Sequence, residues 1–158
     1  MEKIPSFTIN HLNLPPGIYL SRTDQLGDWY LHTYDLRFTS PNNEPVMNTA
    51  EIHTLEHLAA TFLRNHADHK DAVIYFGPMG CRTGFYLILT DAVQGQDVAD
   101  LIEETFDFCA TYDGEIPGAT ARDCGNYLDQ NLPMAKYYAQ RYCEAIKDYQ
   151  DLTFAYPE

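Results

Sequence analysis

The stretch Ala72-Val-Ile-Tyr-Phe-Gly-Pro-Met-Gly-Cys-Arg-Thr-Gly-Phe-Tyr-Leu-Ile-Leu-Thr90 decides the fold class of this chain. Its beginning, Ala72–Phe76, and the run from Cys81 to Thr90 are rich in the β-branched and aromatic side chains that favour strands. Between them, Gly77-Pro-Met-Gly80 has the composition of a tight turn. The stretch therefore predicts two strands joined by a short turn, a connection typical of antiparallel sheets.

Two more segments, nearer the N-terminus, have the composition of strands. Gly17–Ser21 is short, whereas Trp29–Phe38 is long, rich in aromatic residues and partly alternating in polarity. Proline and asparagine in Ser40–Pro45 indicate that a loop follows. The N-terminal part of the chain is therefore expected to contribute strands to the sheet.

A helix is predicted to begin at Asn48 and to run to about Asn65. Asn48 is a good N-cap, and Glu51 follows at the spacing of a capping box. Apolar side chains then recur at helical spacing, at Ile52, Leu55, Leu58, Ala59 and Phe62. One face of this helix is therefore expected to pack against a core.

Two further helices are predicted in the C-terminal half. One runs from about Asp97 to Thr111, and the other starts near Pro133, a residue suited to a first helical turn. Residues 113–131, between them, are rich in glycine and polar residues and are predicted to be irregular. Strands and helices in separate blocks indicate an α+β fold, a single domain over residues 1–158 in which an antiparallel sheet packs against helices.

The composition is that of a folded, acidic protein. The formal net charge is -13, from 23 acidic against 10 basic side chains, which disfavours binding to nucleic acids and to anionic membranes. The N-terminus lacks the apolar run of a signal peptide, and no run is long enough to span a bilayer. The chain is therefore expected in the cytoplasm, with reduced cysteines at Cys81, Cys109, Cys124 and Cys143.

The strongest chemical signal is His53-Thr-Leu-Glu-His57, an H-x-x-E-H motif within the first predicted helix. Residues four apart lie one turn above each other, so both imidazoles point the same way and can share a divalent metal. Glu56 falls on the same side and can move protons at a metal-bound ligand. The alternative is a solvated polar face that happens to carry two histidines, and a third ligand is needed to decide.

Two cysteines qualify as the third ligand. Cys124 lies in a polar loop, and as a thiolate it would complete a two-histidine, one-cysteine site with an open fourth position. Spacing alone favours Cys124 over Cys81 only weakly. Cys81 follows the turn at Gly77–Gly80, which either holds its thiol in a fixed place or carries it incidentally.

Five segments together resemble the S-ribosylhomocysteine lyase family, which makes the precursor of the quorum-sensing signal autoinducer-2. In chain order they are Ser6–His11, Asp35–Phe38, His53–Leu58, Gly77–Tyr86 and Cys124–Leu128. They are spread over nearly the whole chain, and five separate matches are far more specific than the H-x-x-E-H motif alone. The resemblance therefore favours a metal site over a solvated polar face.

The resemblance implies a role for each matching residue. His53, His57 and Cys124 would be the metal ligands, and Glu56 and Cys81 the general acid/base pair. The implied metal is Fe²⁺, which Zn²⁺ or Co²⁺ can replace. The cationic metal, together with Arg82 or Arg37, would favour the Cys81 thiolate needed for the first proton abstraction.

The resemblance also implies how substrate is bound. Ser6, His11 and Arg37 align with positions that contact substrate. The family is a homodimer whose two active sites lie at the interface, with residues from both chains in each. Many members have Asp where this chain has Tyr75, and Lys where it has Thr33. Both departures concern substrate contacts and leave the metal ligands untouched.

The implied reaction cleaves S-ribosyl-L-homocysteine to L-homocysteine and 4,5-dihydroxy-2,3-pentanedione. The sugar carbonyl migrates through enediolates until β-elimination of the thiolate becomes feasible. Such a carbon–sulfur lyase would serve autoinducer synthesis and the recycling of homocysteine in the methyl cycle.

Two other functions are compatible with the motif. An H-x-x-E-H metallopeptidase would use Glu56 to activate a metal-bound water, but it has no use for Cys81. A metal-stabilised binding module would depend on neither residue. Substitution of Glu56 and Cys81 therefore separates the three functions.

Overall fold

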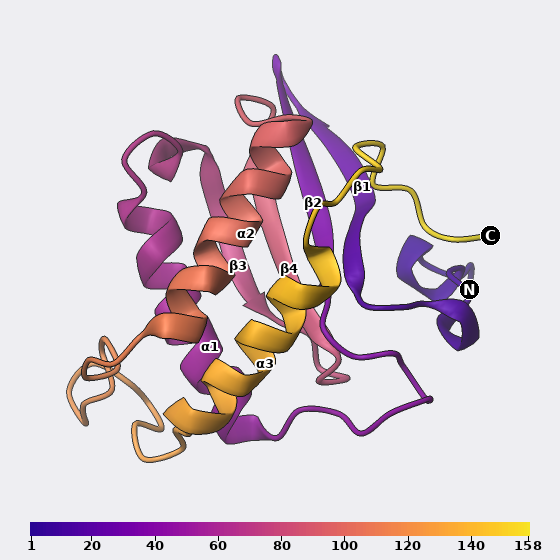
Figure 1. Ribbon diagram of the computed structural model, residues 1–158. Helices are drawn as coiled ribbons and strands as arrows, with labels where there is room; N and C mark the ends of the chain where they lie inside the picture. The colour runs from indigo at the N-terminus through magenta and orange to yellow at the C-terminus, as the bar shows by residue number, and fades with distance from the viewer.

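A four-stranded antiparallel sheet organises the fold (Figure 1), and the computed structural model describes the whole chain, Met1–Glu158. The sheet order is β1-β2-β4-β3, with β1 (Gly17–Leu26), β2 (Trp29–Arg37), β3 (Val73–Pro78) and β4 (Gly84–Thr90). The strand pair predicted around residues 77–80 is the β3–β4 hairpin, and β1–β2 is a second hairpin. Pairing of β2 with β4 joins the two hairpins, so the expected antiparallel sheet is confirmed.

Three helices cover one face of this sheet (Figure 1): α1 (Thr49–Asn65), α2 (Gln96–Thr111) and α3 (Leu132–Ile146). Between helices and sheet lies a cluster of 28 buried residues. At its centre Phe38 stacks on Tyr142 with ring centroids 4.0 Å apart, and Phe106 packs edge-on against both rings. Burial of such rings is a main driving force for docking helices onto a sheet. The expected α+β arrangement of sheet and helices is confirmed.

α1 and α3 begin where their capping residues predict. At the start of α1, the Glu51 carboxylate accepts a hydrogen bond of 2.7 Å from the backbone N–H of Asn48. At the start of α3, the Asn131 side chain accepts one of 3.1 Å from the N–H of Met134, and Pro133 lies in the first turn. These caps fix the start of α1, on which the site is built, and the start of α3, which follows the irregular stretch.

The predicted start of the second hairpin strand at Cys81 is wrong, because the turn is longer than expected. β4 begins at Gly84, and residues 79–83 form the connection. Arg82 adopts a left-handed conformation with φ 61°, and its N–H donates to the carbonyl of Met79 at 3.0 Å. Cys81 consequently lies in the turn itself.

The predicted end of the first strand at Ser21 is also wrong. β1 continues to Leu26 through the polar residues 22–25, which lack strand composition. Each of these residues pairs with β2, and Gly27 closes the hairpin with φ 63°, a conformation that favours glycine. The long partner strand therefore imposes the extended conformation on them.

Strand register gives β2 two chemically different faces. Tyr34 and Leu36 belong to the core, whereas Asp35 and Arg37 are out of phase with them and lie on the face away from the helices. Gly84 pairs with Arg37, and a Cβ at Gly84 would lie 2.2 Å from the carbonyl oxygen of Leu36. Only glycine allows β4 to approach β2 this closely.

The C-terminal tail, residues 147–158, passes along β1 (Figure 1). The backbone N–H of Leu20 donates to the carbonyl of Phe154 at 2.7 Å, and Tyr156 stacks on Tyr19 with ring centroids 4.9 Å apart. The Tyr156 hydroxyl donates to a carboxylate oxygen of Asp35 at 2.8 Å. The tail thus closes over the polar face of β2. None of the helices has the length and apolarity needed to cross a lipid bilayer.

Candidate metal centre

Helix α1 presents two histidines on the side that faces away from the core. Leu55 and Leu58 are fully buried, whereas His53, Glu56 and His57 are half-buried. The two imidazoles lie one helical turn apart, with their Nε2 atoms separated by 2.9 Å. The H-x-x-E-H spacing therefore brings the two rings together, as predicted.

Backbone carbonyls fix the orientation of both rings. Nδ1 of His53 lies 2.9 Å from the carbonyl oxygen of Asp129, and Nδ1 of His57 lies 2.6 Å from that of Pro117. A carbonyl oxygen only accepts, so these contacts favour the tautomer with the ring proton on Nδ1 and the lone pair on Nε2. The Gln130 amide nitrogen also faces Nδ1 of His53, at the longer distance of 3.2 Å. Two lone pairs that face each other repel, and a cation held between them removes the repulsion. Metal-binding histidines typically have this arrangement.

Cys124 supplies a sulfur atom from the irregular stretch predicted over residues 113–131. Its Sγ lies 3.4 Å from Nε2 of His53, and the ligating atoms of His53, His57 and Cys124 all lie within 4.8 Å of one another. The N–H of Asn126 donates to the sulfur at 3.4 Å. These three residues could therefore hold a metal ion, and Cys124 rather than Cys81 is the third member.

Local contacts tie this loop to α1. The Thr54 hydroxyl of α1 accepts the backbone N–H of Asn131 at 2.9 Å and lies 2.6 Å from Oε1 of Gln130. Gly118 follows Pro117 with φ 68°, a conformation that favours glycine and that turns the chain beside His57. The loop is therefore held in place beside both His53 and His57.

Two cavities meet at the candidate metal group. One, of about 520 Å³, is lined by the three possible ligands and by Glu56. The other, of about 320 Å³, lies between α1 and the turn before β4, and its lining includes His53, Glu56 and Arg82. Because Glu56 lines both cavities, a molecule bound beside the metal group would meet its carboxylate.

Cys81 lies in a separate cluster on the turn between β3 and β4. Its side chain is exposed, with Sγ 3.1 Å from the Thr83 hydroxyl and 3.9 Å from Nη1 of Arg37. Arg37 is buried and donates to Asp35 and to Thr83, each at 2.5 Å. Of the two arginines expected to support this thiol, Arg37 is the one in contact with it.

The ion pair between Arg37 and Asp35 holds its charges away from water. Burial disfavours the charge on Arg37, but Asp35, together with Cys81 and Tyr156, outweighs this, and the net effect raises the pKa of Arg37. Burial raises the pKa of the Asp35 carboxyl, while Arg37 opposes that rise. Burial and then Asp35 raise the pKa of Tyr156, which stays a neutral donor. Arg37 is thus a fixed cation beside Cys81.

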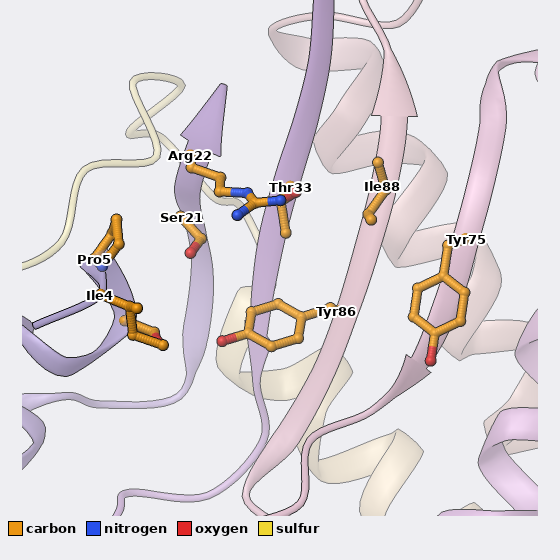
Figure 2. Close-up of a pocket in the computed structure, with 9 residues that line it drawn as sticks. Ile4, Pro5, Ser21, Arg22, Thr33, Tyr75, Tyr86 and Ile88 are labelled. Carbon is orange, nitrogen blue, oxygen red and sulfur yellow. The ribbon is translucent and has the colours of Figure 1, made fainter. Parts of the chain in front are cut away.

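Ser6 lines a third cavity, of about 360 Å³, on the sheet face away from the helices. Figure 2 shows Arg22 extending from β1 toward Thr33 of β2, with the Tyr86 ring between Ser21 and Tyr75. Thr33 and Tyr75, the two positions at which the sequence was expected to depart from the family pattern, both line this cavity.

The predicted site residues fall into separate groups within one chain. The three possible metal ligands lie with Glu56, whereas neither Cys81 nor Arg37 lines the two cavities at the metal group. His11 is half-buried in the short turn His11–Asn13, with its Nδ1 3.0 Å from the carbonyl of Ile9. Ser6 belongs to the third cavity. A single chain does not gather all of them in one cavity.

Sequence patterns did not reveal the residues that support these groups. Pro117 and Asp129 act through their backbone carbonyls, which leave no signature in side-chain spacing. Tyr156 contacts Asp35 from a distant part of the chain. Asp35 and Thr83 lie inside segments that resemble the family, and this resemblance is the one signal that could have found them.

Comparison with known proteins gives one consistent result. The family profile described as S-Ribosylhomocysteinase (LuxS) matches residues 4–152. Proteins named S-ribosylhomocysteine lyase from Clostridium acetobutylicum and Finegoldia magna are 56% and 59% identical over 158 residues, 100% of both chains in each comparison. A protein of the same name from Clostridium beijerinckii is 61% identical over 146 residues, 92% of both chains.

Proposed function

Because the chain belongs to the S-ribosylhomocysteinase (LuxS) family, we propose that it is a metal-dependent lyase that cleaves S-ribosyl-L-homocysteine to L-homocysteine and 4,5-dihydroxy-2,3-pentanedione. The observation that carries this proposal is the convergence of His53, His57 and Cys124 beside Glu56. The dione is the precursor of autoinducer-2. The proposal therefore assigns the chain to quorum-signal synthesis and to the return of homocysteine to the methyl cycle.

The three ligands would hold a divalent metal and leave a coordination position for substrate. Two imidazole nitrogens and a thiolate suit Fe²⁺, Zn²⁺ and Co²⁺, and we assign Fe²⁺ in the cell, with the other two able to replace it. When bound, the metal supplies a Lewis acid that polarises the oxygens of the sugar. The carbonyls of Asp129 and Pro117 support this assignment, because they already orient both Nε2 atoms.

Glu56 and Cys81 would move the protons of the reaction. A thioether resists hydrolysis, so the sugar carbonyl must first migrate toward the carbon that bears sulfur. Each migration removes a proton from one carbon and returns a proton to its neighbour through an enediolate. Acid/base catalysis of such steps typically contributes about 10²–10⁴-fold. Cys81, as a thiolate beside Arg37, would abstract the first proton, and β-elimination would finally release homocysteine.

We further propose that two chains form a homodimer and complete each other's active sites. The separation of Cys81 and Arg37 from the metal cavities within one chain supports this. Exposed apolar side chains from the β1–β2 hairpin and β3, Leu26, Trp29 and Ile74, line one further cavity and would be buried by association. The two sites would then lie at the interface.

Each chain would act as one catalytic domain over residues 1–158. The single buried cluster shared by the sheet and all three helices supports this. We assign the enzyme to the cytoplasm, where its four free cysteines would stay reduced. The candidate site needs two of them, Cys81 and Cys124, as thiolates.

A metallopeptidase is not favoured. The relatives compared above carry the name S-ribosylhomocysteine lyase, and the match extends over the full chain rather than over the motif alone. A peptidase mechanism gives no role to Cys81 and the residues around it, and neither does a metal-stabilised binding module.

A thiol-release assay tests the proposed function. The metal-loaded protein is incubated with S-ribosylhomocysteine and a chromogenic thiol reagent, and we expect homocysteine to be released. Glu56→Gln should lower the rate by about 100-fold or more, because it removes an acid/base group. The matched control is Glu104→Gln, an exposed glutamate of α2 that pairs with His66, and it should keep the full rate.

Two results would contradict the lyase assignment. Cleavage of peptides without homocysteine release would favour the peptidase. Substrate binding that is unaffected by Glu56→Gln and Cys81→Ser, without turnover, would favour the binding module.

A further inference from the structure

We infer that Thr83 is a positioning residue for Cys81: its hydroxyl donates a hydrogen bond to the Cys81 thiolate, and Arg37 holds the hydroxyl in the donating orientation. The inference rests on the proposed function only in taking Cys81 as the thiol that moves protons. It concerns the state of that thiol before any substrate arrives.

The direction of the hydrogen bonds at Thr83 follows from its two neighbours. A hydroxyl donates one proton and accepts through two lone pairs. Arg37 has no acceptor, so its Nη1, 2.5 Å from Thr83 Oγ1, must donate to that oxygen. The hydroxyl proton remains free for its other neighbour, the Cys81 Sγ at 3.1 Å. A thiolate can only accept, so Thr83 donates to the sulfur once Cys81 has lost its proton.

This hydrogen bond favours the thiolate over the thiol. A charged sulfur is the stronger acceptor, so a donor that is already in place stabilises the charged form. Nη1 of Arg37 lies farther from the sulfur, at 3.9 Å, so Thr83 makes the shorter contact. Thr83 is 3% exposed and Arg37 2% exposed, and water therefore competes little at the hydroxyl, while the Cys81 side chain remains open to solvent.

The position of Thr83 is fixed from both sides. Its carbonyl accepts the backbone N–H groups of Phe38 and Thr39, at 2.9 and 3.1 Å. Arg37 is held in turn by Asp35, which also accepts the Tyr156 hydroxyl. The Thr83 oxygen is therefore held within hydrogen-bond distance of the Cys81 sulfur before the thiolate forms.

The pH dependence of Cys81 alkylation tests this inference. The unmodified chain and its variants react with iodoacetamide over a range of pH, and modification of the Cys81 peptide is followed by mass spectrometry. This separates Cys81 from buried Cys109 and from Cys143, whose pKa is raised to about 11 by burial. Thr83→Val keeps the shape and removes the hydroxyl. We expect alkylation near neutral pH to slow about tenfold, with the rate at strongly alkaline pH unchanged.

The serine variant and a neighbouring threonine provide the controls. Thr83→Ser keeps the donor and should restore the neutral-pH rate. Thr39→Val removes a buried hydroxyl that has no hydrogen-bond partner, and it should leave the alkylation profile unchanged. Thr83→Ala serves as a second hydroxyl deletion if valine prevents folding, since valine leaves Arg37 Nη1 facing a methyl group.

The outcomes separate this inference from the proposed function. An unchanged profile in Thr83→Val or Thr83→Ala overturns the inference, and so does a serine variant as slow as the valine variant. Failure of the unmodified chain to release homocysteine would instead refute the lyase assignment, whatever the alkylation profile shows.

Discussion

The histidines of this chain differ in which ring nitrogen keeps a lone pair. In His53 and His57 a backbone carbonyl faces Nδ1, so Nε2 is the nitrogen that can coordinate. His66 shows the opposite arrangement: its Nδ1 accepts the N–H groups of Asp68 and His69, and its Nε2 faces the Glu104 carboxylate. No lone pair of His66 remains for a metal. The partners of a ring thus distinguish the possible ligands from a surface histidine.

This difference leads to a prediction about metal content. His57→Ala should lose the metal, because two ligands rarely retain it, whereas Cys81→Ala should keep about one ion per chain and lose turnover. His66→Ala is the control and should keep both. Metal analysis under anaerobic conditions, combined with the thiol-release assay, measures the two quantities. Substantial turnover by Cys81→Ala would show that the acid/base assignment is wrong.

At the scale of elements, the sequence predicted those features that depend on neighbouring residues. The start of α1 follows from Asn48 and Glu51, and both lie in one helical turn. The length of β1 does not follow from its own composition, because pairing with β2 imposes it. The turn that holds Cys81 was mispredicted for a related reason: an arginine at position 82 gives no sign of a left-handed conformation. The length of β1, which a distant strand sets, and the left-handed residue in the turn were therefore missed.

The close approach of β4 to β2 predicts a severe effect for a small substitution. A Cβ in Gly84→Ala would lie 2.2 Å from the Leu36 carbonyl oxygen, so the strands must separate, and we expect a loss of about 3 kcal/mol in the free energy of unfolding. Gly80→Ala is the matched control, because a Cβ there meets open space. Urea denaturation of both variants measures the difference. Equal stability of the two would mean that the strands are farther apart than described.

At the scale of the whole molecule, the candidate metal ligands come from segments far apart in the sequence. No local pattern predicts that these segments lie together. Cys124 reaches His53 across 71 residues of chain, and the loop that carries it is held by contacts to α1. Spacing left Cys124 and Cys81 as alternatives, and only the family resemblance chose between them before the fold was known. The grouping of site residues into separate cavities was equally invisible in the sequence.

The separation of Cys81 and Arg37 from the metal cavities within one chain leads to a prediction about the oligomeric state. Sedimentation at micromolar concentration should give about twice the chain mass of 18.1 kDa. Trp29→Arg places a charge on an exposed apolar surface at the β1–β2 hairpin and should shift the protein toward the monomer and lower turnover. Tyr137→Arg changes an exposed aromatic residue of α3 and is the control. A monomeric unmodified chain with full turnover would rule out the shared site.

The contact between Tyr156 and Asp35 spans 121 residues, and this separation has a consequence for biosynthesis. A growing polypeptide that has already emerged from the ribosome with β1 and β2 lacks the tyrosine that closes over them. Until translation reaches that point, the carboxylate and the guanidinium beside it remain open to water. We therefore expect the tail to close over Asp35 and Arg37 late in folding, after the strands of the sheet have paired.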